Sequence, residues 1–417
     1  MNNIYKTIEG GICASKGYKA NGTYCGIKKS ANDDPNTPHK NDICLYVSEV
    51  PANAAAVYTQ NKVKGAPIIV TKANLKKSGG KAIAVIANSK NANTCNADGI
   101  EKANKMCLLV SRELGIPQEQ VIVASTGVIG QILPIEPIEK AVPILAKGLD
   151  HHKNLEAATA IMTTDTVKKE YAVEFDINGI TCHLGGMAKG SGMIHPNMAT
   201  TLNFITSDCA ISSEMLQKAL SEIVKITYNC LSIDGDQSTN DMVCLMANGM
   251  ASNEEITCEG DEYEIFKSAL YQVMSNLTRM LAKDGEGATK LLECMCSGAK
   301  DKETAIAVAK SVVCSSLFKA AMFGEDANWG RVLCAIGYAD AEFDINKVDV
   351  DLSSAKGIVG VCRNGSGVEF SEDEASKILS CDEINILINL HDGSCDATAW
   401  GCDLTYDYVK INGDYRT

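Results

Sequence analysis

Hydrophobic residues recur with two different periods along the chain, and segments of the two kinds alternate. Residues 171–176 and 180–184 alternate apolar and polar side chains, and Asn178-Gly179 between them supplies two left-handed positions, so the stretch predicts a β-hairpin. In residues 263–283, apolar side chains recur every three or four positions, which predicts a helix with one buried stripe. Because no repeat of fixed period interrupts this alternation, a mixed α/β fold is expected.

Further elements are predicted on the same grounds. Helices are expected over residues 101–114, 213–226, 304–317 and 396–411, and strands over 121–124, 290–296 and 384–390. Gly115 is expected to end the first of these helices, and Asn412-Gly413 the last. The segment 304–317 is rich in Ala and Val and is expected to pack against a sheet.

The composition is typical of a packed globular protein. Of 417 residues, 45% are hydrophobic and 22% are charged, which excludes disordered, collagen-like and coiled-coil chains. The formal net charge is −13 and no Lys/Arg-rich run occurs, so neither nucleic acid nor a membrane surface is an expected partner. The longest charge-free stretch, residues 190–207, contains His195, Pro196 and several other polar residues, which argues against a membrane span.

The 18 cysteines are expected to be reduced and mostly buried. Residues 1–10 hold no apolar segment of an export signal, and a cytoplasmic protein rarely forms disulfides. No Cys-x-x-Cys spacing occurs, and the closest pair, Cys294 and Cys296, has no His at ligand spacing nearby. A cytoplasmic protein without a metal site is therefore expected.

Seven clusters of Gly, Asn, Ser and Thr lie next to apolar segments, where backbone amides and hydroxyls can surround a small ligand. Each one alone is more often a turn than a site, but seven in one chain favour a ligand site built from several of them. The clusters are residues 88–94, 125–127, 162–165, 185–192, 234–241, 285–287 and 326–331.

The most informative cluster continues to residue 201. A Gly-rich turn is expected to present Lys189, and an Ala199-Thr200 bond follows a Pro-Asn segment. The Thr200 hydroxyl can attack the preceding carbonyl in an N-to-O acyl shift, and hydrolysis of that ester leaves Thr200 as a new N-terminus. Its α-amine, with a pKa near ~8, can then act as the base for its own hydroxyl. A nearby ammonium such as Lys189 would lower the pKa of that amine, although a surface lysine in a loop is the commoner case.

Motifs of one protein family cover essentially the whole chain. They are Gly10-Gly11 and residues 26–29, 56–59, 63–67, 88–93, 125–127, 162–165, 185–200, 234–236, 238–241, 284–287, 328–331 and 410–417. In these motifs the chain resembles the ornithine acetyltransferase family, the arginine-biosynthesis enzymes also called glutamate N-acetyltransferases. The resemblance implies an α/β fold of the ornithine acetyltransferase/DmpA-like kind, a layered sandwich of β-sheets and helices with a smaller lobe. It also implies self-cleavage into an α chain, residues 1–199, and a β chain, residues 200–417.

The resemblance further implies an activity. Thr200 would take acetyl from N2-acetyl-L-ornithine and pass it to L-glutamate, giving L-ornithine and N-acetyl-L-glutamate in a ping-pong reaction. Two such αβ pairs would form an α2β2 heterotetramer. No cofactor is expected, and whether acetyl-CoA also serves as a donor stays open.

The family's functional positions map onto residues of both chains. Thr126 and Gly127 correspond to the oxyanion hole, where a hydroxyl and a backbone amide would stabilise the tetrahedral oxyanion. The Glu286 carboxylate suits the δ-ammonium of ornithine. The positions that correspond to substrate-binding residues are Thr163, Lys189, Thr200, Glu286, Asn412 and Thr417.

Several alternatives stay open at individual positions. Thr201, where many family members have Met, offers a second hydroxyl beside the expected nucleophile, and Thr164 adjoins Thr163. Lys189 can meet the substrate α-carboxylate instead of acting on the amine. His195, five residues before Thr200, is interpreted as shaping the precursor loop and not as a catalytic base.

Two other functions are compatible with the same residues. An N-terminal-nucleophile aminopeptidase or amidase of this fold would use water as the acyl acceptor instead of glutamate. A metabolite-binding protein without catalysis would bind acetylornithine or glutamate and release no ornithine.

Overall fold

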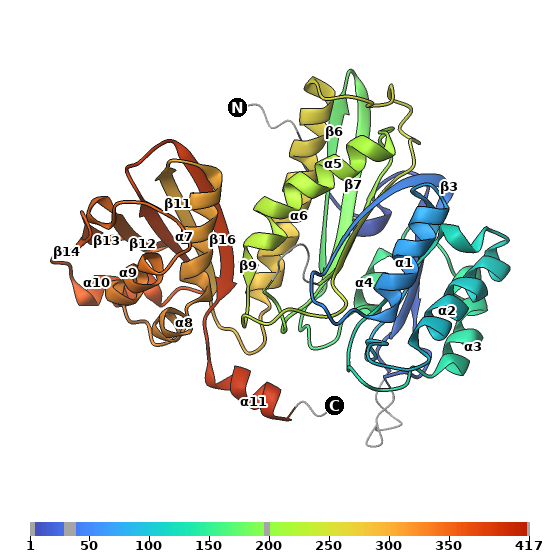
Figure 1. Cartoon of the computed structure of the whole chain (residues 1–417), viewed down its shortest axis with the longest axis horizontal. Coiled ribbons are helices and arrows are strands. Elements are labelled where there is room, and N and C mark those ends of the chain that lie inside the picture. The colour runs from blue at the N-terminus through green and yellow to red at the C-terminus, as the bar shows by residue number, and fades with distance from the viewer. Residues whose placement is uncertain (1–4, 29–38, 196–200, 415–417) are drawn as a thin grey trace.

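The computed structural model describes residues 5–28, 39–195 and 201–414. Figure 1 shows two lobes side by side, each built around one β-sheet with helices packed on it. The first sheet takes strands from both sides of the expected cleavage point. Its strand β7 (Ile180–Lys189) ends before residues 196–200, and its neighbour β8 (Leu202–Ser207) begins after them. The mixed α/β fold expected from the sequence is confirmed. The expected cleavage point, Ala199-Thr200, lies outside the described residues.

Among the described residues, the first sheet has nine strands in the order β1-β6-β7-β8-β10-β3-β4-β5, with β2 paired to β3. Most neighbours are antiparallel, but β8 pairs with β10, and β4 with β5, in parallel. Besides β7 and β8, its strands are β1 (Tyr5–Ile8), β2 (Tyr18–Thr23), β3 (Ile43–Tyr58), β4 (Lys81–Asn88), β5 (Val121–Ser125), β6 (Lys169–Ile177) and β10 (Met242–Ala247).

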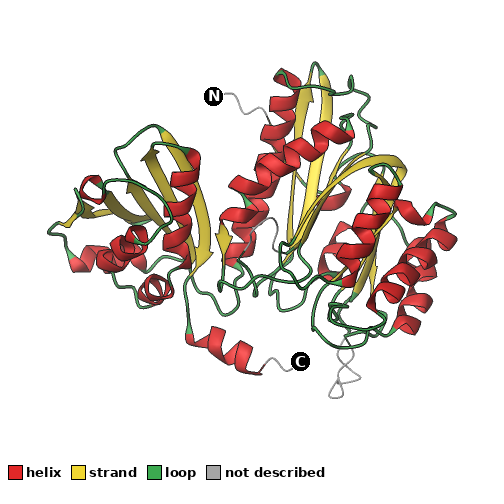
Figure 2. Cartoon of the chain, viewed as in Figure 1, coloured by secondary structure: helices red, strands yellow, loops and turns green. Residues whose placement is uncertain are grey.

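One end of this sheet brings three chain segments together. Lys189, the last residue of β7, is the register partner of Leu202 in β8. Leu202 is also the partner of Met242, the first residue of β10. Residue 201 therefore lies between the end of β7 and the start of β10. In the view of Figure 2, loops gather at the lower edge of the molecule between the two lobes.

Helix α6 (Asp261–Lys283) packs between the two sheets. It contacts β6 and β7 of the first sheet and β11 and β16 of the second (Figure 1). Its predicted apolar stripe is fully buried, namely Phe266, Leu270, Val273, Leu277 and Leu281. The other helices of the first lobe are α1 (Ala66–Lys77), α2 (Gly99–Leu114), α3 (Ile135–Lys147), α4 (Asn154–Ala160) and α5 (Ser213–Ile223).

The second sheet has the strand order β14-β13-β12-β15-β11-β16-β9 within the described part of the chain. Its strands are β9 (Leu231–Ser232), β11 (Leu291–Ala299), β12 (Asp349–Ser354), β13 (Gly357–Arg363), β14 (Ser366–Gly367), β15 (Glu383–Asn389) and β16 (Cys395–Cys402). Its helices are α7 (Lys302–Cys314), α8 (Ser316–Phe323), α9 (Trp329–Gly337), α10 (Glu372–Leu379) and α11 (Tyr406–Asp414).

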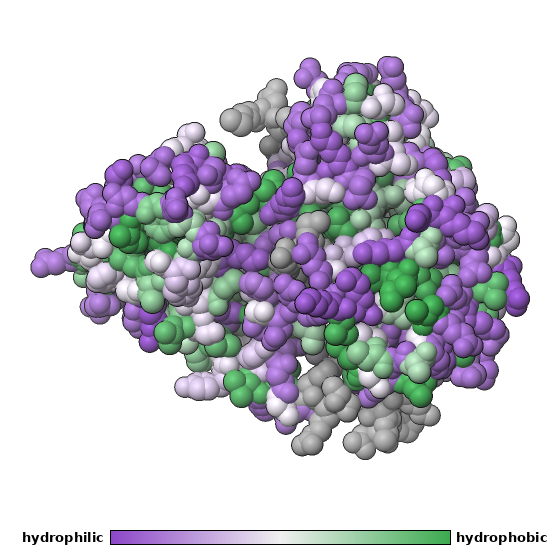
Figure 3. Space-filling model, in the orientation of Figure 1, coloured by the Kyte–Doolittle hydropathy of each residue, from purple (hydrophilic) through white to green (hydrophobic). Residues whose placement is uncertain are grey.

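The two lobes share one hydrophobic core. The largest cluster of buried apolar residues runs from the first sheet through α6 to the second sheet, and two smaller clusters lie within the first lobe. The face shown in Figure 3 is mainly hydrophilic, with apolar residues in separate groups. A continuous core makes the relative position of the lobes part of the packed structure, which matters because the site lies where they meet.

Most of the predicted elements are confirmed. The predicted hairpin is β6 and β7, with φ of 53° at Asn178 and 83° at Gly179, and α2 ends at Leu114 with Gly115 at φ 66°. The segment predicted to pack on a sheet forms α7, which contacts β11 and β16. The remaining confirmed elements, within a few residues of the expected bounds, are the strands β5, β11 and β15 and the helices α5 and α6.

Two predicted helices are wrong in part. Residues 396–402 belong to strand β16, which pairs with both β11 and β9, and the helix begins only at Tyr406 and includes Asn412 and Gly413. Pairing with two distant strands outweighs the local pattern there. The helix expected over 304–317 ends at Cys314. Ser315 is the N-cap of α8, where its hydroxyl accepts a hydrogen bond from Phe318 N, and the two helices meet at 58°.

All 18 cysteines are free thiols and most of them are buried, as expected. Within the described residues, no single helix has both the length and the hydropathy of a membrane-spanning segment.

Candidate active site

Six of the residues expected at the site line one cavity of about 140 Å³. They are Thr126, Gly127, Thr163, Lys189, Glu286 and Asn412. These residues come from segments far apart in the sequence and from both lobes. The other expected site residues, Ala199, Thr200 and Thr417, lie outside the described residues, but Thr201, next to Thr200, lines the same cavity.

Lys189 is a buried residue at the end of β7, so its interpretation as a surface lysine in a loop is wrong. The Gly-rich segment before it is strand and not a turn, because it pairs with β6 and β8. A Cβ at Gly185 would lie 2.0 Å from the carbonyl oxygen of Gly11, so only glycine fits there. The Lys189 ammonium donates a hydrogen bond to Thr126 Oγ1 at 3.3 Å. Burial lowers the pKa of Lys189 below its ordinary value, against the opposing charge of Asp165.

Thr126 and Gly127 follow directly after β5. Gly127 has φ 131°, and a Cβ there would lie 2.1 Å from the carbonyl carbon of Lys90, so only glycine fits this close approach. On either side, Thr126 N donates to Asn88 O and Val128 N donates to Lys90 O, both at 3.0 Å. The peptide around Gly127 is thus fixed on both sides, which is what an oxyanion hole requires.

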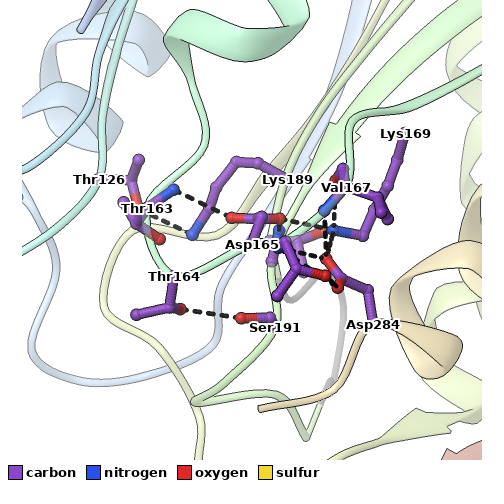
Figure 4. Close-up of polar contacts among 12 residues, drawn as sticks. Thr126, Thr163, Thr164, Asp165, Val167, Lys169, Lys189, Ser191 and Asp284 are labelled. Atoms are coloured by element: carbon purple, nitrogen blue, oxygen red, sulfur yellow. Dashed lines mark hydrogen bonds and ion pairs between the residues drawn. The ribbon is translucent and has the colours of Figure 1, made fainter. Parts of the chain in front are cut away.

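A chain of alternating buried charges lies behind the cavity (Figure 4). The Lys169 ammonium, with no exposed surface, donates to Asp165 at 2.7 Å and to Asp284 at 2.5 Å. Asp165 also accepts hydrogen bonds from Thr163 N at 3.0 Å and from Gly190 N at 2.7 Å. Burial alone would raise the pKa of Asp165, but the nearby lysines and N–H groups lower it to about 2. Asp165 is therefore a fixed negative charge close to Lys189.

Thr163 and Thr164 both line the cavity, but their groups have different partners. Thr163 N is held by Asp165, as described above, while the Thr164 hydroxyl is hydrogen-bonded to Ser191 Oγ at 2.8 Å (Figure 4). The structure thus gives the Thr164 hydroxyl a protein partner, which leaves Thr163 as the better candidate for contact with substrate.

Glu286 and Asn412 meet across the mouth of the cavity. Asn412 Nδ2, on α11, donates to Glu286 Oε2 at 2.8 Å, and Glu286 N donates to Ser191 O at 2.8 Å. The carboxylate is half-buried and makes no ion pair with a described residue. It is therefore available to a cationic group of a ligand.

Comparison with known proteins places the chain in one family. A profile described as the ArgJ family matches residues 19–417. The chain belongs to the ArgJ family. It is 48% identical over 411 residues to the arginine biosynthesis bifunctional protein ArgJ of Caldanaerobacter subterraneus subsp. tengcongensis, covering 98% of this chain and 99% of that protein. It is 49% identical over 405 residues to ArgJ 1 of Clostridium acetobutylicum, covering 96% of each. The family resemblance drawn from the motifs is thereby confirmed.

A solved structure of an ArgJ protein is also similar in sequence. The chain is 44% identical to the arginine biosynthesis bifunctional protein of Bacillus halodurans, with a TM-score of 0.49, and the match covers 52% of this chain and 100% of that chain.

Other residues of this ArgJ-family site were not singled out in the sequence. Asp241, in the cluster 234–241, lines the cavity, and its buried carboxylate accepts a hydrogen bond from Thr201 N at 2.7 Å. Burial raises the pKa of Asp241 to about 7. Asn240 Nδ2 donates to Ala92 O and Ser125 O at 2.6 and 2.9 Å and so ties this cluster to two others. The sequence signals for these roles were the clustering of polar residues and the family motif at residues 238–241.

Two candidates from the sequence lie away from the cavity lining. His195 Nδ1 is 3.0 Å from Ser232 Oγ and 3.6 Å from Cys314 Sγ. The cluster 326–331 begins helix α9, where Asn328 Oδ1 accepts a hydrogen bond from Arg331 N at 3.2 Å. A structural role, the capping of α9, therefore accounts for the cluster 326–331.

Proposed function

We propose that this protein cleaves itself before Thr200 and then transfers acetyl from N2-acetyl-L-ornithine to L-glutamate through an acetyl-Thr200 intermediate. The observation that supports this most directly is the convergence of six family positions, from Thr126 to Asn412, on one small cavity beside Thr201. Membership of the ArgJ family supports the same activity, because the relatives in Caldanaerobacter subterraneus and Clostridium acetobutylicum are named arginine biosynthesis bifunctional proteins.

The geometry suits acyl transfer to and from a hydroxyl. The Thr126 hydroxyl and the Gly127 N–H lie at one side of the cavity, where they would bind the developing oxyanion. Lys189, 3.3 Å from Thr126 Oγ1, adds a positive charge on that side. A buried ammonium near a free α-amine also keeps more of that amine unprotonated, and thus able to act as a base.

Two other residues of the cavity lining suit the amino-acid part of the substrate. The Glu286 carboxylate can bind the δ-ammonium of acetylornithine, and Asn412 orients that carboxylate through its 2.8 Å hydrogen bond. Glutamate, the acceptor, has no cationic side chain, so this contact with Glu286 would be made by acetylornithine and ornithine and not by glutamate. The acceptor amine then attacks acetyl-Thr200, and the Thr200 amine takes the proton.

The proposal includes the state of the protein. Residues 1–199 and 200–417 would remain together after cleavage as an α2β2 heterotetramer in the cytoplasm. The buried ion pair between Lys169 and Asp284 supports the association of the two segments, because it joins them. The transfer would need no metal or prosthetic group, and acetyl-CoA would serve as a second acetyl donor.

Denaturing intact-mass spectrometry, before and after brief mixing with N2-acetylornithine, tests this proposal. Two fragments divided between Ala199 and Thr200, with one acetyl group gained by the C-terminal fragment, are expected. Thr200→Ala should give one intact chain that folds but does not transfer acetyl. An uncut, unmodified wild-type chain, or ordinary turnover by Thr200→Ala, would remove Thr200 from the mechanism.

The acceptor distinguishes acetyl transfer from hydrolysis. With acetylornithine and glutamate both present, N-acetylglutamate should form in step with ornithine. Release of acetate with no N-acetylglutamate would instead identify an amidase of the same fold.

A further inference from the structure

Thr201 has an unfavourable backbone conformation. Its φ is 127°, a region that β-branched residues rarely adopt, and its side chain is buried. Such a conformation is energetically unfavourable and persists only where the surroundings impose it. The residue that would follow the nucleophile is thus held in a strained state.

Three hydrogen bonds hold Thr201 in this state. Thr201 N donates to Asp241 Oδ1 at 2.7 Å, and Thr201 O accepts from Met242 N at 2.9 Å. Thr201 Oγ1 accepts from Asn203 Nδ2. All the polar groups of Thr201 are therefore engaged, which argues against its hydroxyl as a second nucleophile.

Gly190, directly after β7, leaves space for the Thr201 side chain. A Cβ added to Gly190 would lie 2.6 Å from Thr201 Cγ2, well inside van der Waals contact. Gly190 has φ 152° and its N–H is held by Asp165. Thr201 is thus confined between the segment that carries Lys189 and the segment that carries Asp241.

Burial of the Asp241 carboxylate at this position is energetically unfavourable. Asp241 is 3% exposed and forms no ion pair with any residue in the described ranges. Asp241 accepts hydrogen bonds from Thr201 N and from Ser238. Burial of a carboxylate without an ion pair still costs stability, so its hydrogen bond to Thr201 is not explained as a contribution to folding. A role in holding the reacting segment accounts for it.

We propose that Asp241 is a positioning residue for the nucleophile, which holds Thr201 N–H and thereby fixes the residue that directly follows Thr200 in the chain. The inference rests on the proposed function of Thr200. In self-cleavage, the Thr200 hydroxyl oxygen bonds to the Ala199 carbonyl carbon, the Ala199–Thr200 C–N bond breaks, and the hydroxyl proton passes to the released amine. Water then hydrolyses the ester. Asp241 takes part in neither bond and acts only through Thr201.

Full-length Asp241→Ala and Asp241→Asn test the inference, with Asp208→Asn as the matched control. Asp208 is also fully buried and accepts backbone N–H bonds, from His183 at 2.7 Å and Lys16 at 3.0 Å, but lies just beyond the opposite end of β8. The rate of precursor cleavage is followed by denaturing mass spectrometry. The kcat and KM for acetylornithine are then measured per mole of cleaved chain.

Asp241→Ala should slow cleavage and lower kcat by about a hundredfold, the cost of a misplaced reacting group, with little change in KM. Asp241→Asn keeps an oxygen acceptor for Thr201 N–H and should recover most of both rates, and Asp208→Asn should match wild type. Wild-type rates in Asp241→Ala, or equal losses in all three variants, would overturn the inference. So would an Asp241→Asn variant as slow as Asp241→Ala, because that result assigns the effect to charge and not to position.

A second variant covers the case in which Asp241→Ala does not fold. Gly190→Ala displaces Thr201 by direct contact while Asp241 is kept, and it should slow cleavage and lower kcat in the same way. Wild-type rates in folded Gly190→Ala would overturn the inference. Failure of the wild-type chain itself to cleave or to acetylate Thr200 would instead count against the proposed function.

Discussion

Lys169 and Asp284 form a buried ion pair with Nζ and Oδ2 2.5 Å apart, although 115 positions separate them in the sequence. Lys169 also binds Asp165, whose carboxylate accepts hydrogen bonds from Thr163 N and from the N–H of the residue after Lys189. Asp284 in turn holds the N–H of Thr166 at 3.1 Å and lies two residues before Glu286. Lys169 therefore connects the segments of Thr163 and Lys189 with the segment that carries Glu286.

Lys169→Met should destabilise the protein strongly. The substitution keeps most of the side-chain volume but leaves the carboxylates of Asp165 and Asp284 buried without their cation. Removing one partner of a buried ion pair costs about 3–5 kcal/mol. Urea unfolding should show this loss, and the triple variant Lys169→Met/Asp165→Asn/Asp284→Asn should recover part of it. A Lys169→Met variant as stable as wild type would show that the two carboxylates have other compensation.

Thr126→Val tests the hydroxyl of the proposed oxyanion hole. Valine keeps the shape of Thr126 but removes the group that lies 3.3 Å from Lys189 Nζ. The kcat for acetyl transfer should fall by about 10²–10³, with KM nearly unchanged, because the hydroxyl would act on the transition state. Thr164→Val is the matched control, since its hydroxyl already binds Ser191, and should retain most activity. Equal losses in both variants would contradict the assignment.

Glu286→Gln should mainly raise the KM for acetylornithine. The substitution keeps the size of Glu286 and its partner Asn412 but removes the charge that would bind the δ-ammonium. Loss of a charged hydrogen bond is worth about 1.5–3 kcal/mol, so kcat/KM should fall roughly ten- to a hundredfold. Steady-state kinetics with Asp407→Asn as the control measures this, since Asp407 is an exposed carboxylate on α11, the helix that carries Asn412. An unchanged KM in Glu286→Gln would remove the proposed contact.

The elements that the sequence predicted correctly are those with a strong local pattern. The hairpin around Asn178-Gly179 is determined by residues that are neighbours in the chain. Strand β16 was predicted as helix because its conformation depends on pairing with β11 and β9, which are distant in sequence. Local periodicity contains no information about such partners.

The site followed a similar rule. Family motifs identified Thr126, Gly127, Lys189 and Glu286, and the structure brings these residues together. The motifs could not show that Lys189 is buried, because its burial depends on strands that pack from both halves of the chain. The motifs did not indicate a role for Lys169 for the same reason, because only the fold brings the carboxylates of Asp165 and Asp284 to it.

Asp241 should make the stability of the protein depend on pH between about 4 and 7. Burial raises its pKa from 3.8 to about 7, with the hydrogen bonds from Thr201 N and Ser238 and the charge of Lys189 opposing the shift. Within this range the folded chain binds a proton that the unfolded chain has lost, so the contribution of Asp241 to stability falls as pH rises and is constant above 7.

Asp241→Asn removes this dependence because its amide does not titrate. Urea unfolding should be measured for wild type and Asp241→Asn from pH 5 to pH 8. As pH rises towards 7, the free energy of unfolding of the variant should increase relative to that of wild type by up to roughly 1.4 kcal/mol per pH unit, and above pH 7 the difference should stay constant. A constant difference between wild type and Asp241→Asn over the whole range would mean that Asp241 keeps an ordinary pKa despite its burial.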